Sequence, residues 1–197
     1  MEVETSIPAR PYSPDEPSTL VDVFIGVTRN HKRPDTLNYK SGDRWIPISS
    51  DEMLQRAQSI AAGLHAIGVN PGDRVALLSE SRVEWTLTDA GSIFAGTIDV
   101  PIYPTLTPPQ VRYILNDSGA CVLFLESRKK FDELKEALGE CPAVKHVIFF
   151  EPDGVTPCDS KKITCLTSGH SPSASFNSSN FARFSRKSTH APESLRM

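Results

Sequence analysis

Two stretches decide the fold: residues 68–78 read Gly-Val-Asn-Pro-Gly-Asp-Arg-Val-Ala-Leu-Leu, and residues 98–105 read Ile-Asp-Val-Pro-Ile-Tyr-Pro-Thr. A turn is favoured at Pro71 and Gly72, because proline presets φ and glycine takes positive φ without strain. The apolar run 75–78 is typical of a strand covered on both faces, and the start of the second stretch has the same character. The residues between them have the length of one helix. Strand, helix and strand in this order predict a right-handed parallel βαβ unit.

The composition is that of an ordinary chain with a hydrophobic core. Its 197 residues, 39% of them hydrophobic, suffice for one domain or for one domain with a tail. The net charge of −3 argues against a nucleic-acid-binding protein, which would show a basic stripe. No run approaches the roughly 18 apolar residues of a membrane span, and the acidic start Met-Glu-Val-Glu-Thr is not a secretory signal. The cysteines form no Cys-x-x-Cys pair, which predicts reduced thiols in a cytoplasmic protein without a metal site: Cys121, Cys141, Cys158 and Cys165.

The chain before the βαβ unit is predicted to form an entry to it. Residues 1–17 are rich in proline and indicate an extended lead-in. Helical spacing of apolar residues follows over 20–27. Two short runs around Gly42 predict a β-hairpin. Ser49 and Glu52 are spaced for a capping box at the start of the next helix.

Two further helix–strand pairs are predicted after the βαβ unit. Residues 107–110 read Thr-Pro-Pro-Gln, an N-cap, a proline at the first helical position and a capping-box partner. Strands are predicted at 121–125 and 144–150, with an amphipathic helix over 127–138 between them. The lysines at 129–130 are predicted on its solvated outer face. The alternation predicts an α/β fold, with a mainly parallel sheet flanked by helices and an N-terminal hairpin.

The character of the chain changes near residue 155. Residues 156–197 are rich in serine, show no sustained period of 2 or 3.6, and are basic whereas the body is acidic. Such a segment cannot bury enough apolar surface to offset its ordering entropy, so we expect it to be disordered. We favour a reading-frame shift near residue 155, which would make the tail non-native. A partner-binding tail and an ordinary linker are the alternatives.

A series of motifs runs through the predicted α/β part. Residues 71–76 read Pro-Gly-Asp-Arg-Val-Ala, 81–85 read Ser-Arg-Val-Glu-Trp, and 100–105 read Val-Pro-Ile-Tyr-Pro-Thr. Over residues 18–155 this order resembles the N-terminal part of the long-chain acyl-CoA synthetases (long-chain fatty acid–CoA ligases) of the AMP-binding, adenylate-forming superfamily. One position departs from the family, which usually has asparagine where this chain has Ser81.

The resemblance implies an ATP-dependent ligase that acts in two steps. A fatty acid carboxylate attacks the α-phosphate of ATP–Mg²⁺ to give an acyl-adenylate and pyrophosphate, and the thiol of coenzyme A then displaces AMP. Fatty acid, ATP, Mg²⁺ and CoA are thus implied for the full-length family, and none of them is assigned to this chain. No nucleic-acid partner and no transmembrane segment is expected. The protein is expected in the cytoplasm, with peripheral membrane contact left open.

The nucleotide loop of that family, Thr-Ser-Gly-Thr-Thr-Gly-x-Pro-Lys-Gly, is not found. The nearest string, Thr167-Ser168-Gly169, continues His-Ser-Pro-Ser, and we interpret it as a chance match in a serine-rich tail. Backbone N–H groups of glycine-rich loops cradle phosphates, and this sequence shows no such loop. We therefore carry over no catalytic residue and no metal ligand from the family. We therefore predict a truncated ligase that is inactive alone. The alternative is a stand-alone, non-catalytic α/β module that binds a partner or an acyl ligand.

Four residues remain as candidates for a substrate or CoA path. Tyr103, Pro104 and Thr105 follow a predicted parallel strand, and ligands favour the carboxyl ends of such strands. The alternative there is a tight turn with a packed tyrosine. Arg82, at the start of a helix beside the same edge, could contact another part of the full enzyme. The alternative there is helix capping, with Trp85 packed in the core.

Overall fold

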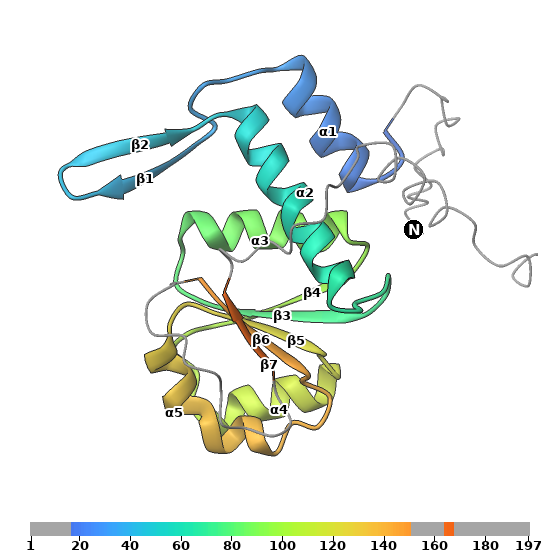
Figure 1. The fold of residues 1–197 in the computed structure, drawn as a ribbon, viewed down its shortest axis with the longest axis vertical. Coiled ribbons are helices and arrows are strands. Elements are labelled where there is room, and N and C mark those ends of the chain that lie inside the picture. The colour runs from blue at the N-terminus through green and yellow to red at the C-terminus, as the bar shows by residue number, and fades with distance from the viewer. Residues whose placement is uncertain (1–16, 151–163, 168–197) are drawn as a thin grey trace, which may run out of the picture.

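The computed structural model describes residues 17–150 and 164–167 (Figure 1). Its elements alternate between helices and strands from the second helix to the strand that ends at Phe149. In chain order they are α1 (Leu20–Asn30), β1 (Leu37–Ser41), β2 (Arg44–Ile48), α2 (Ser50–Ala66), β3 (Arg74–Leu78), α3 (Val83–Phe94), β4 (Ile98–Ile102), α4 (Pro108–Ser118), β5 (Val122–Leu125), α5 (Arg128–Gly139), β6 (His146–Phe149) and β7 (Thr164–Thr167).

The central sheet is parallel throughout, with strand order β4-β3-β5-β6-β7. In its register Val75 of β3 lies opposite Asp99 of β4 on one side and Val122 of β5 on the other. The strands β1 and β2 form a separate antiparallel hairpin, which projects from the body in Figure 1. The predicted α/β class, the parallel βαβ unit β3–α3–β4 and the N-terminal hairpin are therefore confirmed.

Alternate residues of each central strand point to opposite faces, and each face has its own core. Val75 and Leu77 pack with residues of α2 and α3, whereas Ala76 and Leu78 pack with residues of α4 and α5. Figure 1 shows α1, α2 and α3 on one side of the sheet and α4 and α5 on the other. Because both faces are covered, the strands are apolar runs rather than alternating ones.

Side-chain caps set where the helices begin. Thr19 caps α1 and Thr107 caps α4, each in a complete capping box. Of the two hydrogen bonds of the capping box predicted at α2, one is formed: the Ser49 hydroxyl accepts a hydrogen bond from the Glu52 N–H at 3.2 Å. Gly119 ends α4 in the left-handed region at φ +66°. Arg74 holds the same helix end, because its Nε donates to the Ser118 carbonyl oxygen at 2.6 Å.

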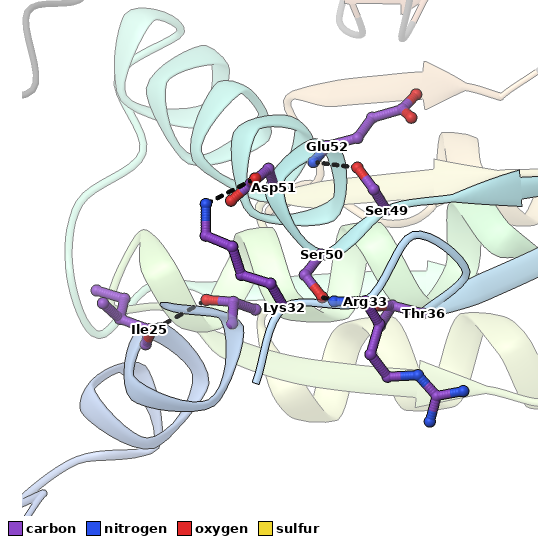
Figure 2. Close-up of polar contacts among 9 residues, drawn as sticks. Ile25, Lys32, Arg33, Thr36, Ser49, Ser50, Asp51 and Glu52 are labelled. Carbon is purple, nitrogen blue, oxygen red and sulfur yellow. Dashed lines mark hydrogen bonds and ion pairs between the residues drawn. The ribbon is translucent and has the colours of Figure 1, made fainter. Parts of the chain in front are cut away.

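The loop after α1 is tied to the start of α2 (Figure 2). Buried Ser50 accepts a hydrogen bond from the Arg33 N–H at 3.0 Å, and its hydroxyl lies 2.7 Å from that of Thr36. Lys32 and Asp51 form an exposed ion pair at 2.9 Å beside it. This junction fixes how α1 and the hairpin meet α2.

The helices α2 and α3 approach closely at a glycine. A Cβ at Gly91 of α3 would lie 2.5 Å from Cγ2 and 2.6 Å from Cβ of Ile60 in α2. The contact therefore needs a residue without a side chain.

Within the described part of the chain, no helix combines the length and apolar character needed to cross a membrane.

Four residues of the segment predicted to be disordered form a strand. Thr164–Thr167 is β7, which pairs in parallel with β6 at the edge of the sheet. Here the expectation of disorder is wrong: a run as short as Thr-Cys-Leu-Thr gives no sustained period, yet it suffices to extend a sheet that already exists. The rest of the tail, 156–163 and 168–197, and the lead-in residues 1–16 lie outside the described residues.

Candidate functional site

The carboxyl ends of the parallel strands meet at one edge of the sheet. The chain leaves β3 for β4 on one side and then crosses to β5 on the other side of β3. The strand order therefore reverses between β3 and β5. Ligands of open α/β sheets bind in the crevice outside such a reversal, so the loops after β3, β4 and β5 define the candidate site.

The turn after β4 carries three of the predicted site residues. Tyr103 is 78% exposed, and its carbonyl oxygen accepts a hydrogen bond from the Leu106 N–H at 3.2 Å. Thr105 is exposed as well. The tight turn of the alternative interpretation is present, but its packed tyrosine is wrong, because the Tyr103 ring lies in solvent. Exposed aromatic rings at this edge are available to a ligand or to another polypeptide segment.

Lys130 of α5 holds this turn in place. Its Nζ donates to the carbonyl oxygen of Pro104 at 2.9 Å and lies 3.3 Å from Glu133 Oε2. The Lys130 side chain is only 16% exposed, so its prediction on a solvated helix face is wrong. Sequence spacing could not have found this contact, because the two partners are far apart in the chain and meet only when α5 docks.

Arg82 stands at the N-cap of α3, just beyond β3, without a side-chain capping bond. Its Nε pairs with Glu84 Oε2 at 2.8 Å, and its guanidinium carbon lies 5.8 Å from the centre of the Phe150 ring. Burial alone would raise the pKa of Glu84, but hydrogen bonding and charge from Arg82 hold that pKa below its ordinary value. Trp85 is partly buried against the core, as the structural alternative predicted.

A carboxylate bridges the loops at the strand-order reversal. Glu126 follows β5, and its Oε2 accepts a hydrogen bond from the backbone N–H of Glu80, which follows β3, at 3.2 Å. The hydroxyl of buried Ser79 donates to the Glu80 carbonyl oxygen at 2.9 Å. Sequence reasoning missed Glu126. Its one signal is its place as the first residue after a buried strand.

The described residues do not form a complete cradle for a nucleotide. Their positive-φ glycines are isolated turn residues rather than a glycine-rich run. Thr167, the first residue of the Thr-Ser-Gly string, ends β7, and the string then leaves the described residues. Over residues 17–150, no group of three or more His, Cys, Asp or Glu side chains could hold a metal ion. We therefore derive no reaction step through ATP or Mg²⁺ from this chain.

Two carboxyl groups lie on the α3 side of the sheet. Burial raises the pKa of Asp99 in β4 to about 7, and the charge of Asp89 in α3 adds to that rise. Both carboxylate oxygens of Asp99 are buried without a hydrogen-bond partner among the described residues. Burial also raises the pKa of Asp89. This pair weakens the fold at neutral pH, because its charged form is poorly solvated.

The thiols of Cys121 and Cys141 are not activated. Cys141 is buried and Cys121 partly buried, and neither is in a disulfide. Burial raises the pKa of both thiols, which lowers their reactivity. The partly buried His65 lies with its Nδ1 3.0 Å from the Val69 carbonyl oxygen, in line with a helix-end residue rather than a general base.

The sequence of this chain matches a known family. The family model "AMP-binding enzyme" matches residues 27–181, and the chain belongs to this family. The predicted membership of the adenylate-forming superfamily is thereby confirmed.

Its similar proteins include long-chain-fatty-acid–CoA ligases. One from Mycobacterium bovis is 32% identical over 158 residues, which cover 79% of this chain and 26% of the relative. One from Mus musculus is 26% identical over 141 residues, covering 72% of this chain and 20% of the relative. The crystal structure of an anthranilate CoA ligase in complex with anthranoyl-AMP matches with a TM-score of 0.58 and 25% identity, over 66% of this chain and 24% of that one. The chain thus spans about a quarter of the length of its curated relatives.

Proposed function

We propose that this chain is the N-terminal portion of a long-chain fatty acid–CoA ligase and does not form acyl-adenylate alone. The observation that carries the proposal is the 32% identity to the Mycobacterium bovis ligase over most of this chain but only 26% of the relative. A ligase needs a phosphate cradle and a positive charge at the transferring phosphate. The described residues offer no such cradle, which supports inactivity of the chain alone.

The 103–105 turn and Arg82 are proposed to face the path of the fatty acid or CoA in the full-length enzyme. They follow neighbouring parallel strands, β4 and β3, at the edge where such folds bind ligands. The exposed Tyr103 ring supports this role, since nothing in the described core requires it. Lys130 would act as a positioning residue, because it touches the Pro104 carbonyl from α5.

A chimeric ligase tests the proposal. Residues 1–150 of this chain would replace the matched segment of the Mycobacterium bovis ligase, and acyl-CoA formation from palmitate, ATP and CoA would be measured. We expect activity in the chimera and no acyl-AMP from the purified 197-residue chain. A folded chimera without activity would contradict the ligase origin of this portion. Acyl-AMP made by the 197-residue chain would contradict its inactivity.

The stand-alone module predicts a different outcome. A finished module would be monodisperse and would melt cooperatively. It would not restore catalysis when it replaces the matched segment of a ligase. A fragment exposes apolar surface that the rest of the enzyme would cover, and it binds ANS or aggregates.

A further inference from the structure

The strands β3, β4 and β5 end at the same level of the sheet. Leu78, the last residue of β3, lies opposite Ile102 of β4 on one side and Leu125 of β5 on the other, and these two residues also end their strands. The loops that follow therefore start side by side. Two of them carry the residues proposed to face the ligand path, Arg82 after β3 and the 103–105 turn after β4.

The connection between β5 and α5 holds both of these loops. Glu126 Oε2 accepts a hydrogen bond from the N–H of Glu80, in the loop after β3, at 3.2 Å. Lys130 Nζ donates to the carbonyl oxygen of Pro104, in the turn after β4, at 2.9 Å. Because both bonds go to backbone groups, they fix the course of the loops themselves. We call residues 126–130 the β5–α5 junction.

The β5–α5 junction is itself fixed on both sides. The carbonyl oxygen of Leu125, just before it, accepts a hydrogen bond from the Phe150 N–H at 3.0 Å. Within the junction, the Ser127 hydroxyl accepts a hydrogen bond from the Lys130 N–H at 3.3 Å and so caps α5. Phe131, the residue that follows, is 2% exposed and anchors α5 in the core. Side chains that project from such a support hold their partners in one geometry.

The two loops have less support of their own. Glu80 and Thr105 are exposed, and Tyr103 is 78% exposed. Backbone with few buried apolar contacts opens most easily. The bonds to Glu126 and Lys130 therefore limit how far the loops can separate. A ligand that lies between two loops depends on that separation, because a displacement of about 1 Å already impairs its positioning.

The charges around the loops favour one of the two substrates. In the described part of the chain, the charged side chains of these loops and of their contacts are four carboxylates and two cations: Glu80, Glu84, Glu126, Glu133, Arg82 and Lys130. This excess of negative charge repels the phosphate groups of CoA. The acyl chain of a fatty acid carries no charge and meets no such repulsion.

We infer that Glu126 and Lys130 are positioning residues that together set the separation of the two loops around the acyl chain of the fatty acid. The inference rests on the proposed function and deepens it, because it adds Glu126 and names the substrate that passes between the loops. A side chain that only satisfied a backbone N–H would stabilise the fold without changing substrate binding. The two roles therefore differ in their effect on KM.

Amide hydrogen exchange on the 197-residue chain tests the two contacts one by one. Glu126→Ala should quicken exchange at the Glu80 amide and leave that of Leu106 unchanged. Lys130→Met should quicken exchange at Leu106, whose N–H closes the turn after β4, and leave Glu80 unchanged. Glu136→Ala, which removes an exposed carboxylate of α5, is the control and should change neither.

Kinetics of the chimera test whether the two loops line one path. Although they loosen different loops, Glu126→Ala and Lys130→Met should both raise the KM for palmitate, each by about fivefold, the factor that one hydrogen bond supplies. The kcat and the KM values for ATP and CoA should stay the same, as expected when only substrate binding is weakened. Glu126→Gln keeps an acceptor oxygen for the Glu80 N–H and should restore the KM for palmitate. Glu136→Ala should have no effect.

Each other outcome has a distinct meaning. A raised KM for CoA in place of palmitate assigns the loops to the other substrate and overturns the inference. A lower melting temperature of both variants with every KM unchanged shows a purely structural role and also overturns it. In both cases an active chimera leaves the proposed function standing, whereas a folded chimera without activity overturns the two together.

A shorter side chain replaces Glu126→Ala if that variant does not fold. Glu126→Asp keeps the negative charge, but it lacks one methylene group and cannot reach the Glu80 N–H. We expect the same rise in the KM for palmitate from this variant. An unchanged KM with quickened exchange at Glu80 would overturn the inference.

Discussion

The helices α3 and α4 lie on opposite faces of the same sheet, and they are covered to different depths. Six of the twelve residues of α3 are buried, against two of the eleven of α4. α2 covers α3 from outside, as Figure 1 shows, and the two helices touch at Gly91. The outer side of α4 carries an exposed groove around Tyr113. The difference teaches that this chain completes one face of its sheet with a second layer of helices and leaves the other face one layer deep.

The largest effect is expected from a substitution in the core between the sheet and the single layer of α4 and α5. It tests whether that face is loosely held. Phe131 of α5 is 2% exposed and packs edge-on against Phe149 with ring centres 5.8 Å apart. Phe131→Ala should lower the free energy of unfolding by about 3–5 kcal/mol through the cavity that it creates. Urea denaturation measures the change. Tyr113→Ala on the outer side of α4 is the control, expected within about 0.5 kcal/mol. Equal small effects would mean that this face has no tight core.

The double layer is tested by Gly91→Ala. The new methyl group would overlap the Ile60 side chain near its branch point, so the helices must separate. We expect a loss of about 1–3 kcal/mol in the free energy of unfolding. Gly63→Ala in α2 is the matched control, because a Cβ there meets nothing within 4 Å. That variant should gain about 0.5–1 kcal/mol from helix propensity. A stabilising Gly91→Ala would show that α2 and α3 are not in close contact.

A pH series sharpens the comparison on the α3 side. Burial, with the charge of Asp89, raises the pKa of Asp99 from 3.8 to about 7 in the folded protein. Between these values the folded state binds more protons than the unfolded state, so stability falls as pH rises from about 4 to 7. Asp99→Asn should therefore raise the melting temperature at pH 8 and lose this advantage as the pH falls toward 4. Asp43→Asn in the exposed hairpin turn is the control. A constant difference at all pH values would contradict the burial of Asp99.

The smallest effect concerns the contact between α5 and the turn after β4 at the carboxyl edge. Lys130→Met removes the hydrogen bond to the Pro104 carbonyl oxygen and should cost about 1 kcal/mol of unfolding free energy. Amide hydrogen exchange at Leu106, whose N–H bonds to Tyr103, should quicken. Lys129→Met, at the exposed neighbouring position, should leave both unchanged. If the two variants behaved alike, Lys130 would not position the turn.

Local signals in the sequence predicted the elements well. The Thr107-Pro108 start of α4 is a backbone requirement written in adjacent residues, so it can be read without the fold. The alternating strands and helices likewise required a parallel sheet. β7 was missed, because four residues carry no period and the strand forms only on the template that β6 provides.

The candidate site was predictable only in part. The turn at Tyr103 could be placed at the carboxyl edge from its position after a strand. The bridge from Glu126 and the contact from Lys130 could not, because both depend on which strands become neighbours. Asp99 looked like an ordinary residue of an apolar run, and its burial beside Asp89 of α3 appears only in the fold. Properties that depend on a residue's own neighbours in sequence were thus accessible, and properties that depend on strand order were not.

The position of β3 in the sheet has a consequence for synthesis. It is the first strand of the sheet to leave the ribosome, yet it lies inside the finished sheet, with β4 on one side and β5 on the other. β3 therefore stays half-paired while all of α4 is translated. A chain stopped before Val122 would expose the bare inner edge of an apolar strand to other nascent chains. The inner edge of β3 is covered only once β5 has been made.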